Sequence, residues 1–379
     1  MRRHGGSKFY AGVLVLAAAA TWLGLWGLRP GANRAYALGG TGTVYTMTNA
    51  TSDNAVMAYT RASNGTLTLL GTYSTQGLGS GNDLYSQGAV TLTPGNQFLL
   101  VVNPGSNDVS SFAVQPNGSL VFVDRVSSAG FRPVSVAAFG NLVYVVNFGP
   151  TPTPNVVGYT LGAGGTLTEI VGSSRNLSAT SARPGEVTFS DDGSILVAQE
   201  KNTSKLDTFT VGSNGIATGP MVQNSNGMTP FGMAFDNLDH LIVAEAAAST
   251  VSSYSVATNG VLTVISGSVP DDGSKACWVA TSNNPGFPTQ YSYIANTGSH
   301  SISSLSIGAS GALTLVASRA GSNVGDVRDM AVSTGSTYLY GVSHTAGFIT
   351  GLKLNSNGTM TQVVQITGIP NTAQGMAAY

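Results

Sequence analysis

The chain has 379 residues, only 9 % of them are charged, and the formal net charge is −1. No basic patch and no acidic tail is present, so we do not expect a nucleic-acid partner. Cys277 is the only cysteine. No disulfide can therefore form within the chain, and its stability must come from burial and from the closure of the fold.

The N-terminal residues form a separate segment. Arg2, Arg3 and Lys8 precede an uncharged stretch from Phe9 to Leu28, and a small-x-small pattern ends at Ala37. These features predict an export signal over residues 1–37, cleaved after Ala37, and hence a secreted or extracytoplasmic protein. The alternative is an uncleaved anchor, because about 20 uncharged residues can span a bilayer. This anchor would be the only contact with a membrane.

One sequence pattern recurs seven times in the rest of the chain. A run of β-forming residues is followed by Asn-Gly, Gly-Gly or Ser-Gly and then by another β-rich run. These turns begin at Asn64, Asn117, Gly164, Asn214, Asn259, Ser310 and Asn357. A period of roughly 45 to 53 residues, made only of strands, is typical of a β-propeller blade.

Each repeat divides into four short runs, so the fold class that we predict is all-β. Residues 38–379 are expected to form a single seven-bladed β-propeller domain with four antiparallel strands per blade. The chain enters this pattern at a second run, from Thr43, and leaves it on a first run, from Gln374. One blade must therefore combine three N-terminal strands with one C-terminal strand, which closes the ring without a free edge.

The repeat also predicts which residues surround one mouth of the channel. The ends of the second strands and the starts of the first strands lie on the same face. Five of the seven second strands end in Asn or Ser, which suits turns and caps, but two end in Glu200 and Glu245. These carboxylates are candidate catalytic groups or salt-bridged rim residues. The Gly- and Ser-rich loop from Ser74 to Gln87 is either a lid over this mouth or a tolerated insertion.

Three arginines occupy equivalent positions where first strands begin: Arg132, Arg183 and Arg328. An Arg fork binds carboxylate or phosphate, so an anionic ligand is expected, unless Arg183 pairs with Glu186 and Arg328 with Asp329. The starts of two other first strands carry aromatic residues, Phe231 and Trp278. Their rings either stack on a ligand or pack between the blades.

Motifs for other chemistries are absent from the sequence, including a nucleophile elbow, a P-loop, a zincin helix and a C-x-x-C pair. His300 and His344 follow second strands and therefore lie near the mouth. Cys277 is expected to be a buried, inert thiol, because no histidine is adjacent to it in the repeat.

The YVVN-like second strands, the SSF or SSY third strands and the NGTLTLL outer strands resemble the seven-bladed β-propeller lactonases, a family that includes 6-phosphogluconolactonase-like and carboxymuconate-cyclase-like proteins. The resemblance covers the chain after the signal. It implies turnover of lactone rings on small acids by His, Arg and Glu around the channel mouth, without an obligatory metal. The best-matching segment, residues 182–190, lacks the histidines of the family pattern and carries Arg183 and Glu186 instead.

Two functions follow from these residues. The first is a lactonase-like hydrolase in which Arg183, Glu186, Glu200 and Glu245 are the catalytic candidates. Arg132, Phe231, Trp278 and Arg328 would bind the small-molecule lactone. The second is a non-catalytic extracellular propeller that binds an anionic ligand, a glycan or a protein partner at the same mouth. We expect a monomer with no cofactor, and a divalent metal held by channel carboxylates and amides is the alternative.

Overall fold

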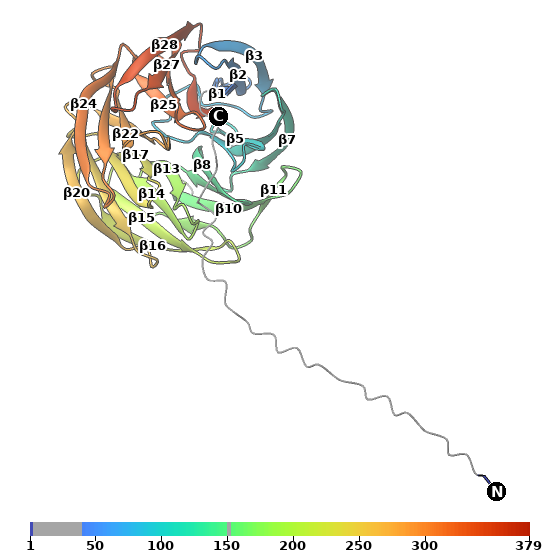
Figure 1. Cartoon of the computed structure of the whole chain (residues 1–379). Helices are drawn as coiled ribbons and strands as arrows, with labels where there is room; N and C mark the ends of the chain where they lie inside the picture. The colour runs from blue at the N-terminus through green and yellow to red at the C-terminus, as the bar shows by residue number, and fades with distance from the viewer. Residues whose placement is uncertain (3–39, 150–152) are drawn as a thin grey trace. The chain divides into compact units, whose positions relative to one another are not determined.

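A computed structural model describes residues 1–2, 40–149 and 153–379. The predicted signal therefore lies almost entirely outside the described residues. The contacts divide the chain into Met1–Ala35 and Tyr36–Tyr379, and the second unit contains all of the described strands. Figure 1 shows this unit as a ring of twisted sheets.

Each sheet is a blade of consecutive antiparallel strands, except that blade 1 borrows its innermost strand from the C-terminus. Blade 1 contains β29 (Gln374–Ala378), β1 (Gly42–Met47), β2 (Ala55–Arg61) and β3 (Leu67–Ser74). Blade 2 contains β4 (Val90–Leu92), β5 (Phe98–Asn103), β6 (Asp108–Val114) and β7 (Leu120–Ser127). Blade 3 contains β8 (Pro133–Phe139), β9 (Leu142–Asn147), β10 (Asn155–Leu161) and an outer strand in two pieces, β11 (Leu167–Glu169) and β12 (Arg175–Asn176).

The other four blades follow in chain order. Blade 4 contains β13 (Pro184–Phe189), β14 (Ile195–Glu200), β15 (Lys205–Val211) and β16 (Ala217–Asn224). Blade 5 contains β17 (Pro230–Phe235), β18 (His240–Glu245), β19 (Thr250–Val256) and β20 (Leu262–Pro270). Blade 6 contains β21 (Ala276–Thr281), β22 (Gln290–Asn296), β23 (Ser301–Ile307) and β24 (Leu313–Ser322). Blade 7 contains β25 (Val327–Val332), β26 (Tyr338–Ser343), β27 (Phe348–Leu354) and β28 (Met360–Thr367).

The predicted seven-bladed, all-β propeller is therefore confirmed, and so is its closure. The first strands of neighbouring blades contact one another around the whole ring, which places them at its centre. The second strands are the most deeply buried, because they pack between two blades; Leu99, Leu100, Val101 and Val102 of β5 are all 0 % exposed.

The glycines of the repeated turns pack closely against the preceding blade. Gly65 and Gly118 adopt φ angles of 86° and 83°, which a side chain would disfavour. Their carbonyl oxygens accept hydrogen bonds from tyrosines of the preceding blade, Tyr340 to Gly65 and Tyr45 to Gly118, both at 2.8 Å. A Cβ at Gly65 would lie 2.4 Å from the Tyr338 ring, so the close approach of the blades also requires glycine.

The C-terminus completes blade 1. Tyr45 of β1 pairs with Ala377 of β29, and Tyr379 donates its backbone N–H to Thr43 at 3.0 Å. Arg61 of β2 reaches the Tyr379 carbonyl through two nitrogens, at 3.3 and 3.2 Å. Strands from both ends of the chain thus share one sheet.

We expect deletion of Thr372–Tyr379 to destabilise the whole propeller rather than one blade. The deletion removes an innermost strand that contacts both β25 and β4, and a domain has only about 5–15 kcal/mol of stability to lose. Thermal unfolding followed by circular dichroism would measure the change. A truncated chain that melts at the temperature of the intact chain would contradict this topology.

The segment between β3 and β4 enters the centre of the ring and contacts the innermost strands. Gln87 donates its side-chain amide to Met233 of blade 5 at 3.0 Å and to Val279 of blade 6 at 2.9 Å, and its backbone N–H to Gly185 of blade 4 at 3.0 Å. The carbonyl of Gly88 accepts from Val136 of blade 3, at 2.9 Å.

The same segment also reaches the two remaining first strands. The backbone N–H of Gly88 donates to Asp329 of blade 7 at 3.1 Å, and Gln374 of blade 1 accepts from Leu84 at 2.8 Å. The long loop is therefore a tether that joins the innermost strands, and the lid interpretation does not describe it.

Gln87→Ala should lower the free energy of unfolding by about 2–4 kcal/mol, because it leaves buried backbone groups of two blades without partners. Chemical denaturation would measure the loss. The matched control is Gln362→Ala, on the exposed face of β28, which should change stability by less than about 0.5 kcal/mol. Equal free energies of unfolding for the two variants would show that the hydrogen bonds of Gln87 do not stabilise the propeller.

Candidate functional site

Four consecutive blades begin with a residue in the left-handed region, and three of these residues are cations. Arg132, Arg183, Thr229 and Lys275 have φ angles of 56°, 50°, 59° and 59°. Such a conformation costs a non-glycine residue about 1 kcal/mol or more. The carbonyls of Arg132, Thr229 and Lys275 stabilise it by accepting hydrogen bonds at 3.0–3.1 Å from the segments that follow the second strands. The fold therefore holds these positions at the mouth in a repeated backbone geometry.

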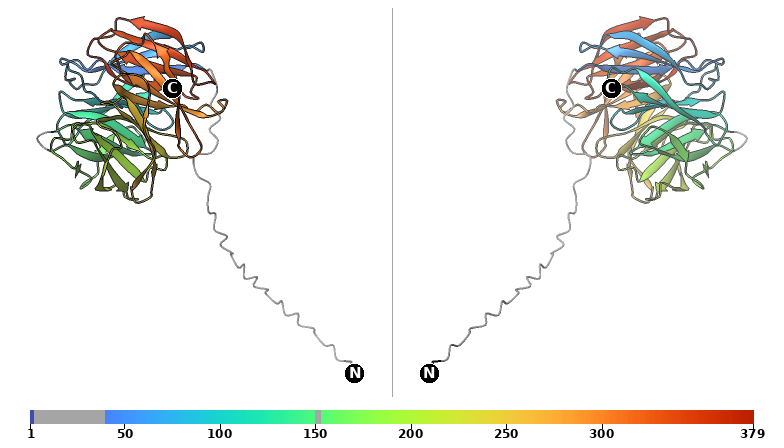
Figure 2. Two further views of the ribbon diagram at one scale, coloured as in Figure 1. Left: turned by 90° about the vertical axis from the view of Figure 1, so that its left-hand side faces the viewer. Right: turned by 90° about the vertical axis from the view of Figure 1, so that its right-hand side faces the viewer.

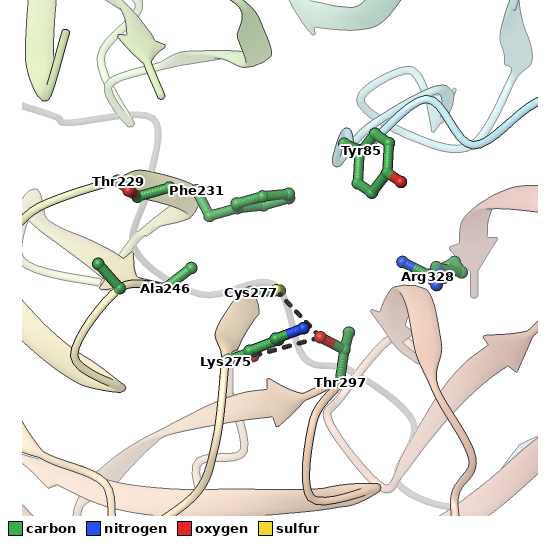
Figure 3. Close-up of a pocket in the computed structure, with 9 residues that line it drawn as sticks. Tyr85, Thr229, Phe231, Ala246, Lys275, Cys277, Thr297 and Arg328 are labelled. Carbon is green, nitrogen blue, oxygen red and sulfur yellow. Dashed lines mark hydrogen bonds between the residues drawn. The ribbon is translucent and has the colours of Figure 1, made fainter. Parts of the chain in front are cut away.

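A cavity of about 390 Å³ opens at this mouth. Figure 3 shows Phe231 of β17 on one side of it, facing Tyr85 and Arg328 across the open space. The complete lining is Tyr85, Thr229, Phe231, Ala246, Ala247, Lys275, Cys277, Thr297 and Arg328. Blades 5, 6 and 7 and the tether contribute to it. It combines two aromatic rings with two cationic side chains, a mixture suited to a small ring that carries an anionic or carbonyl group.

Arg328 is held in the cavity wall by two carboxylates. It forms ion pairs with Asp83 of the tether at 2.7 Å and with Asp326 at 3.0 Å. Burial alone would raise the pKa of Asp326, but hydrogen bonds from Ser343 and Thr345 and the charge of Arg328 lower it. Asp326 therefore stays ionised. The predicted pairing of Arg328 with Asp329 is not the one that the structure shows.

His344 extends the same network. Its Nδ1 lies 2.7 Å from the Asn371 carbonyl, and its Nε2 lies 3.5 Å from Asp326 and 3.9 Å from Asp83. The Nε atoms of Arg328 and Arg132 are buried and have no hydrogen-bond partner among the described residues. Buried donors without acceptors are rare in native proteins.

Arg132 and Arg183 both lie against the aromatic ring of Phe148. Their guanidinium carbons are 5.1 and 5.7 Å from the centre of the Phe148 ring. Arg132 also donates to the carbonyl of Asp83 at 3.1 Å. Burial, and then the positive charge of Arg183, lowers the pKa of Arg132. The predicted pairing of Arg183 with Glu186 does not occur, so this pair of arginines leaves positive charge at the mouth.

Lys201 is buried beside the cavity, directly after β14. It is 6 % exposed, and its Nζ lies 4.8 Å from the centre of the Phe231 ring. It donates to the carbonyls of Tyr85 and, at 3.2 Å, Pro184. Burial is the main reason that its pKa falls to about 7, and the charges of Arg183 and Arg132 lower it further.

The structure does not bring the predicted catalytic carboxylates into the cavity lining. Glu186 is 5 % exposed, and it accepts a hydrogen bond from the Met233 amide of the next blade. Burial raises its pKa well above the usual range, and the nearby Asp329 raises it further. Glu186 is therefore a group of the inner channel, where it connects β13 to β17.

Glu200 and Glu245 are both 0 % exposed. Glu200 accepts hydrogen bonds from Ser178 at 2.9 Å, from the Ala179 amide at 3.2 Å and from Thr203. Glu245 accepts four, from the Gly227 amide and from Thr250, Ser252 and Ser268, at 2.6–3.0 Å. Both carboxylates organise loops at the rim, and these hydrogen bonds occupy their oxygens.

The two predicted aromatic residues have different environments. Phe231 lines the cavity, whereas Trp278 is 0 % exposed and donates its indole N–H to the Val327 carbonyl of blade 7. The rings meet edge to face, with centroids 4.7 Å apart and an interplanar angle of 80°. Trp278 thus packs between blades and supports Phe231 from behind.

The described ranges contain no group of three or more His, Cys, Asp or Glu side chains that could hold a metal ion. The absence of a cofactor remains a prediction. Residues 1–2, 40–149 and 153–379 also include no helix with the length and hydropathy needed to cross a bilayer.

The structure brings Arg132, Arg183, Phe231 and Arg328 to the mouth, together with His344, which the repeat placed near it, and adds five residues that the repeat analysis did not select. They are Asp83, Tyr85, Lys201, Lys275 and Asp326. Lys275 had a detectable signal, because it aligns with Arg132 and Arg183 in the repeat. Asp83 and Tyr85 had none, because they lie in the tether, which has no counterpart in the other repeats.

Comparisons with known proteins agree with this architecture. Residues 39–149 match the sequence model of the family described as "Lactonase, 7-bladed beta-propeller". A solved candidate 6-phosphogluconolactonase from Bacteroides fragilis superposes with a TM-score of 0.71 at 17 % identity, over 89 % of this chain and 97 % of that one. The periplasmic gluconolactonase PpgL of Pseudomonas aeruginosa gives 0.68 at 15 % identity, over 89 % and 98 %. No curated protein sequence matches the chain significantly.

The fold and the mouth thus define a seven-bladed β-propeller. Residues 39–149, which contain three strands of blade 1, all of blade 2 and the first two strands of blade 3, match the lactonase propeller family, so the resemblance noted from the strand sequences is confirmed.

Glu245→Gln should lower the free energy of unfolding by about 2–3 kcal/mol, because an amide nitrogen would replace one acceptor in a buried four-donor site. Turnover per folded molecule should not change if the role of Glu245 is structural. Exposed Glu169 on β11 provides the control, and Glu169→Gln should leave stability unaltered. A folded Glu245→Gln protein that has lost activity would restore Glu245 as a catalytic candidate.

Proposed function

We propose that this protein hydrolyses a small lactone with an anionic substituent in the mouth cavity. The observation that carries the proposal is the position of Arg328 in the wall of a 390 Å³ cavity, between two carboxylates that fix its orientation. The family match and the names of the gluconolactonase-like neighbours support the same reaction class.

Arg328 is suited to stabilise the oxyanion that forms when water attacks the lactone carbonyl. A donor that is already oriented loses little free energy to reorganisation during the reaction. Asp83 and Asp326 supply that orientation. Phe231 and Tyr85 provide ring faces against which the substrate packs.

The other cations of the mouth would bind the anionic substituent. Lys275 lines the cavity, and Arg132 and Arg183 lie at the equivalent positions of blades 3 and 4. Within the described residues none of these three side chains forms an ion pair, so their charges are available to a carboxylate or phosphate.

We further propose that the reaction takes place outside the cytoplasm. The basic and apolar N-terminal segment supports export, and a structural neighbour from Pseudomonas aeruginosa is named a periplasmic enzyme. The N-terminal sequence of the mature protein recovered from its native host would test the predicted cleavage after Ala37.

A binding function without catalysis is the second candidate. The observation in its favour is that Glu200 and Glu245 have structural hydrogen bonds and that the cavity lining contains no carboxylate. Calorimetry with the corresponding open hydroxy acids would detect a ligand that binds without turnover.

The decisive experiment is a panel of neutral and anionic lactones, assayed by proton release at controlled pH. The wild type should prefer anionic lactones. Arg328→Gln should lower kcat/KM by about 10²–10³, as expected for loss of an oxyanion donor. Lys275→Gln should raise KM for anionic lactones only.

Arg319→Gln is the control, because Arg319 is exposed on β24. If the wild type turned over no lactone, the hydrolase proposal would fail. Full activity in folded Arg328→Gln would remove Arg328 from the reaction.

A further inference from the structure

Lactone hydrolysis needs a group that accepts a proton from the attacking water, and the cavity lining contains no carboxylate. Lys201 lies next to the cavity and is buried, with only 6 % of its surface exposed. Its amine lies behind Tyr85 and Phe231, which both line the cavity, and it contacts both: it donates to the carbonyl of Tyr85 and lies against the Phe231 ring.

The hydrogen bonds of Lys201 fit a neutral amine. A neutral amine has two N–H groups and one lone pair, whereas an ammonium group has three N–H groups and no acceptor. The structure offers Lys201 two carbonyl acceptors, those of Tyr85 and Pro184. If both N–H groups donate to these carbonyls, the lone pair is the remaining position and is free to accept a proton.

The backbone around Lys201 makes room for this arrangement. A Cβ at Gly185 would lie 2.6 Å from the Lys201 Nζ and 2.7 Å from the Tyr85 carbonyl oxygen. The absence of a side chain at this first-strand position is therefore required for the amine to reach both carbonyls. No carboxylate forms an ion pair with Lys201 among the described residues.

The surrounding charges favour the neutral form. Burial has the largest effect, and Arg183 and Arg132 act in the same direction, while Asp83 and Cys277 oppose them. The resulting pKa of about 7 leaves a large neutral fraction of Lys201 near neutral pH. A base is most effective when its pKa is close to the working pH.

We propose that Lys201 accepts the proton of the hydrolytic water, directly or through one further water molecule. This inference rests on the proposed lactonase function. The water oxygen forms a bond to the lactone carbonyl carbon, and its proton passes to the Lys201 amine. When the ring C–O bond breaks, the ammonium group returns the proton to the leaving oxygen. One water and one lactone thus give one hydroxy acid, and Lys201 is neutral again.

The first part of the test does not depend on catalysis. The chain has five lysines, Lys8, Lys201, Lys205, Lys275 and Lys353. A ¹³C NMR titration of lysine-labelled protein should show one side chain that titrates near pH 7. Lys201→Met should remove that signal. If the Lys201 signal titrates near 10, the inference is overturned.

The second part is the pH–rate profile of the wild type, Lys201→Met and Lys201→Arg on a lactone that the wild type hydrolyses. Wild-type kcat/KM should rise with pH through about 7 and level off. Both variants should lose about 10²–10⁴-fold in rate. They should also lose the inflection, because methionine cannot accept a proton and arginine remains charged. Lys353→Met, on the exposed face of β27, should behave like the wild type.

The outcomes separate the two proposals. Activity in the wild type with no loss in folded Lys201→Met would overturn the role of Lys201 and leave the lactonase function standing. An inactive wild type would overturn both. Folding of each variant is judged from its melting temperature and from the unchanged NMR signals of the other lysines.

Discussion

The structure depends on the tether that runs through the centre of the ring. Seven first strands line the channel, and each contacts the first strands of the two neighbouring blades. Gln87 and Gly88 hydrogen-bond directly to five of these strands, those of blades 3 to 7. Leu84 adds the first strand of blade 1, through Gln374. The strand of blade 2 follows the tether in the chain. Because one short segment joins all the blades, its conformation cannot change without disturbing the whole channel.

The tether links the fold to the site. Residues that precede Gln87 emerge at the mouth, where Asp83 fixes Arg328 and Tyr85 forms part of the cavity wall. The Tyr85 carbonyl also accepts from Lys201. The contacts that hold the channel together thus position both the cation proposed to stabilise the oxyanion and the amine proposed to accept the proton. A site supported in this way is rigid, which favours electrostatic stabilisation of a transition state over adaptable binding.

Most of the fold could be predicted from the sequence, and the site only in part. Asn-Gly and Gly-Gly turns recur because the blade contact needs positive φ and no side chain, so the repeat carries its own physical signal. Arg132 and Arg183 were identified because they occupy one position of the repeat, directly before a first strand. The predicted equivalence of Arg328 is wrong, because the strand register places Asp326 at that position in blade 7 and Arg328 two residues further along. The same reasoning selected Glu200 and Glu245, which interrupt the repeat, yet their hydrogen bonds serve the rim loops. A break in a repeat identifies a special position but does not distinguish a catalytic group from a structural one.

The distribution of charge gives the strongest argument that the mouth is functional. Five of the 16 lysines and arginines, Arg132, Arg183, Lys201, Lys275 and Arg328, lie at this mouth. Three of them adopt a left-handed backbone conformation, and Lys201 is buried without an ion pair among the described residues. Backbone strain at the left-handed residues, repulsion between the cations and the desolvation of Lys201 all destabilise this arrangement. The arrangement therefore does not help the propeller to fold. A chain with so few charges could have placed these cations on its solvent-exposed outer strands. Their concentration at the mouth is explained if an anionic ligand and a developing oxyanion restore the balance of charge there.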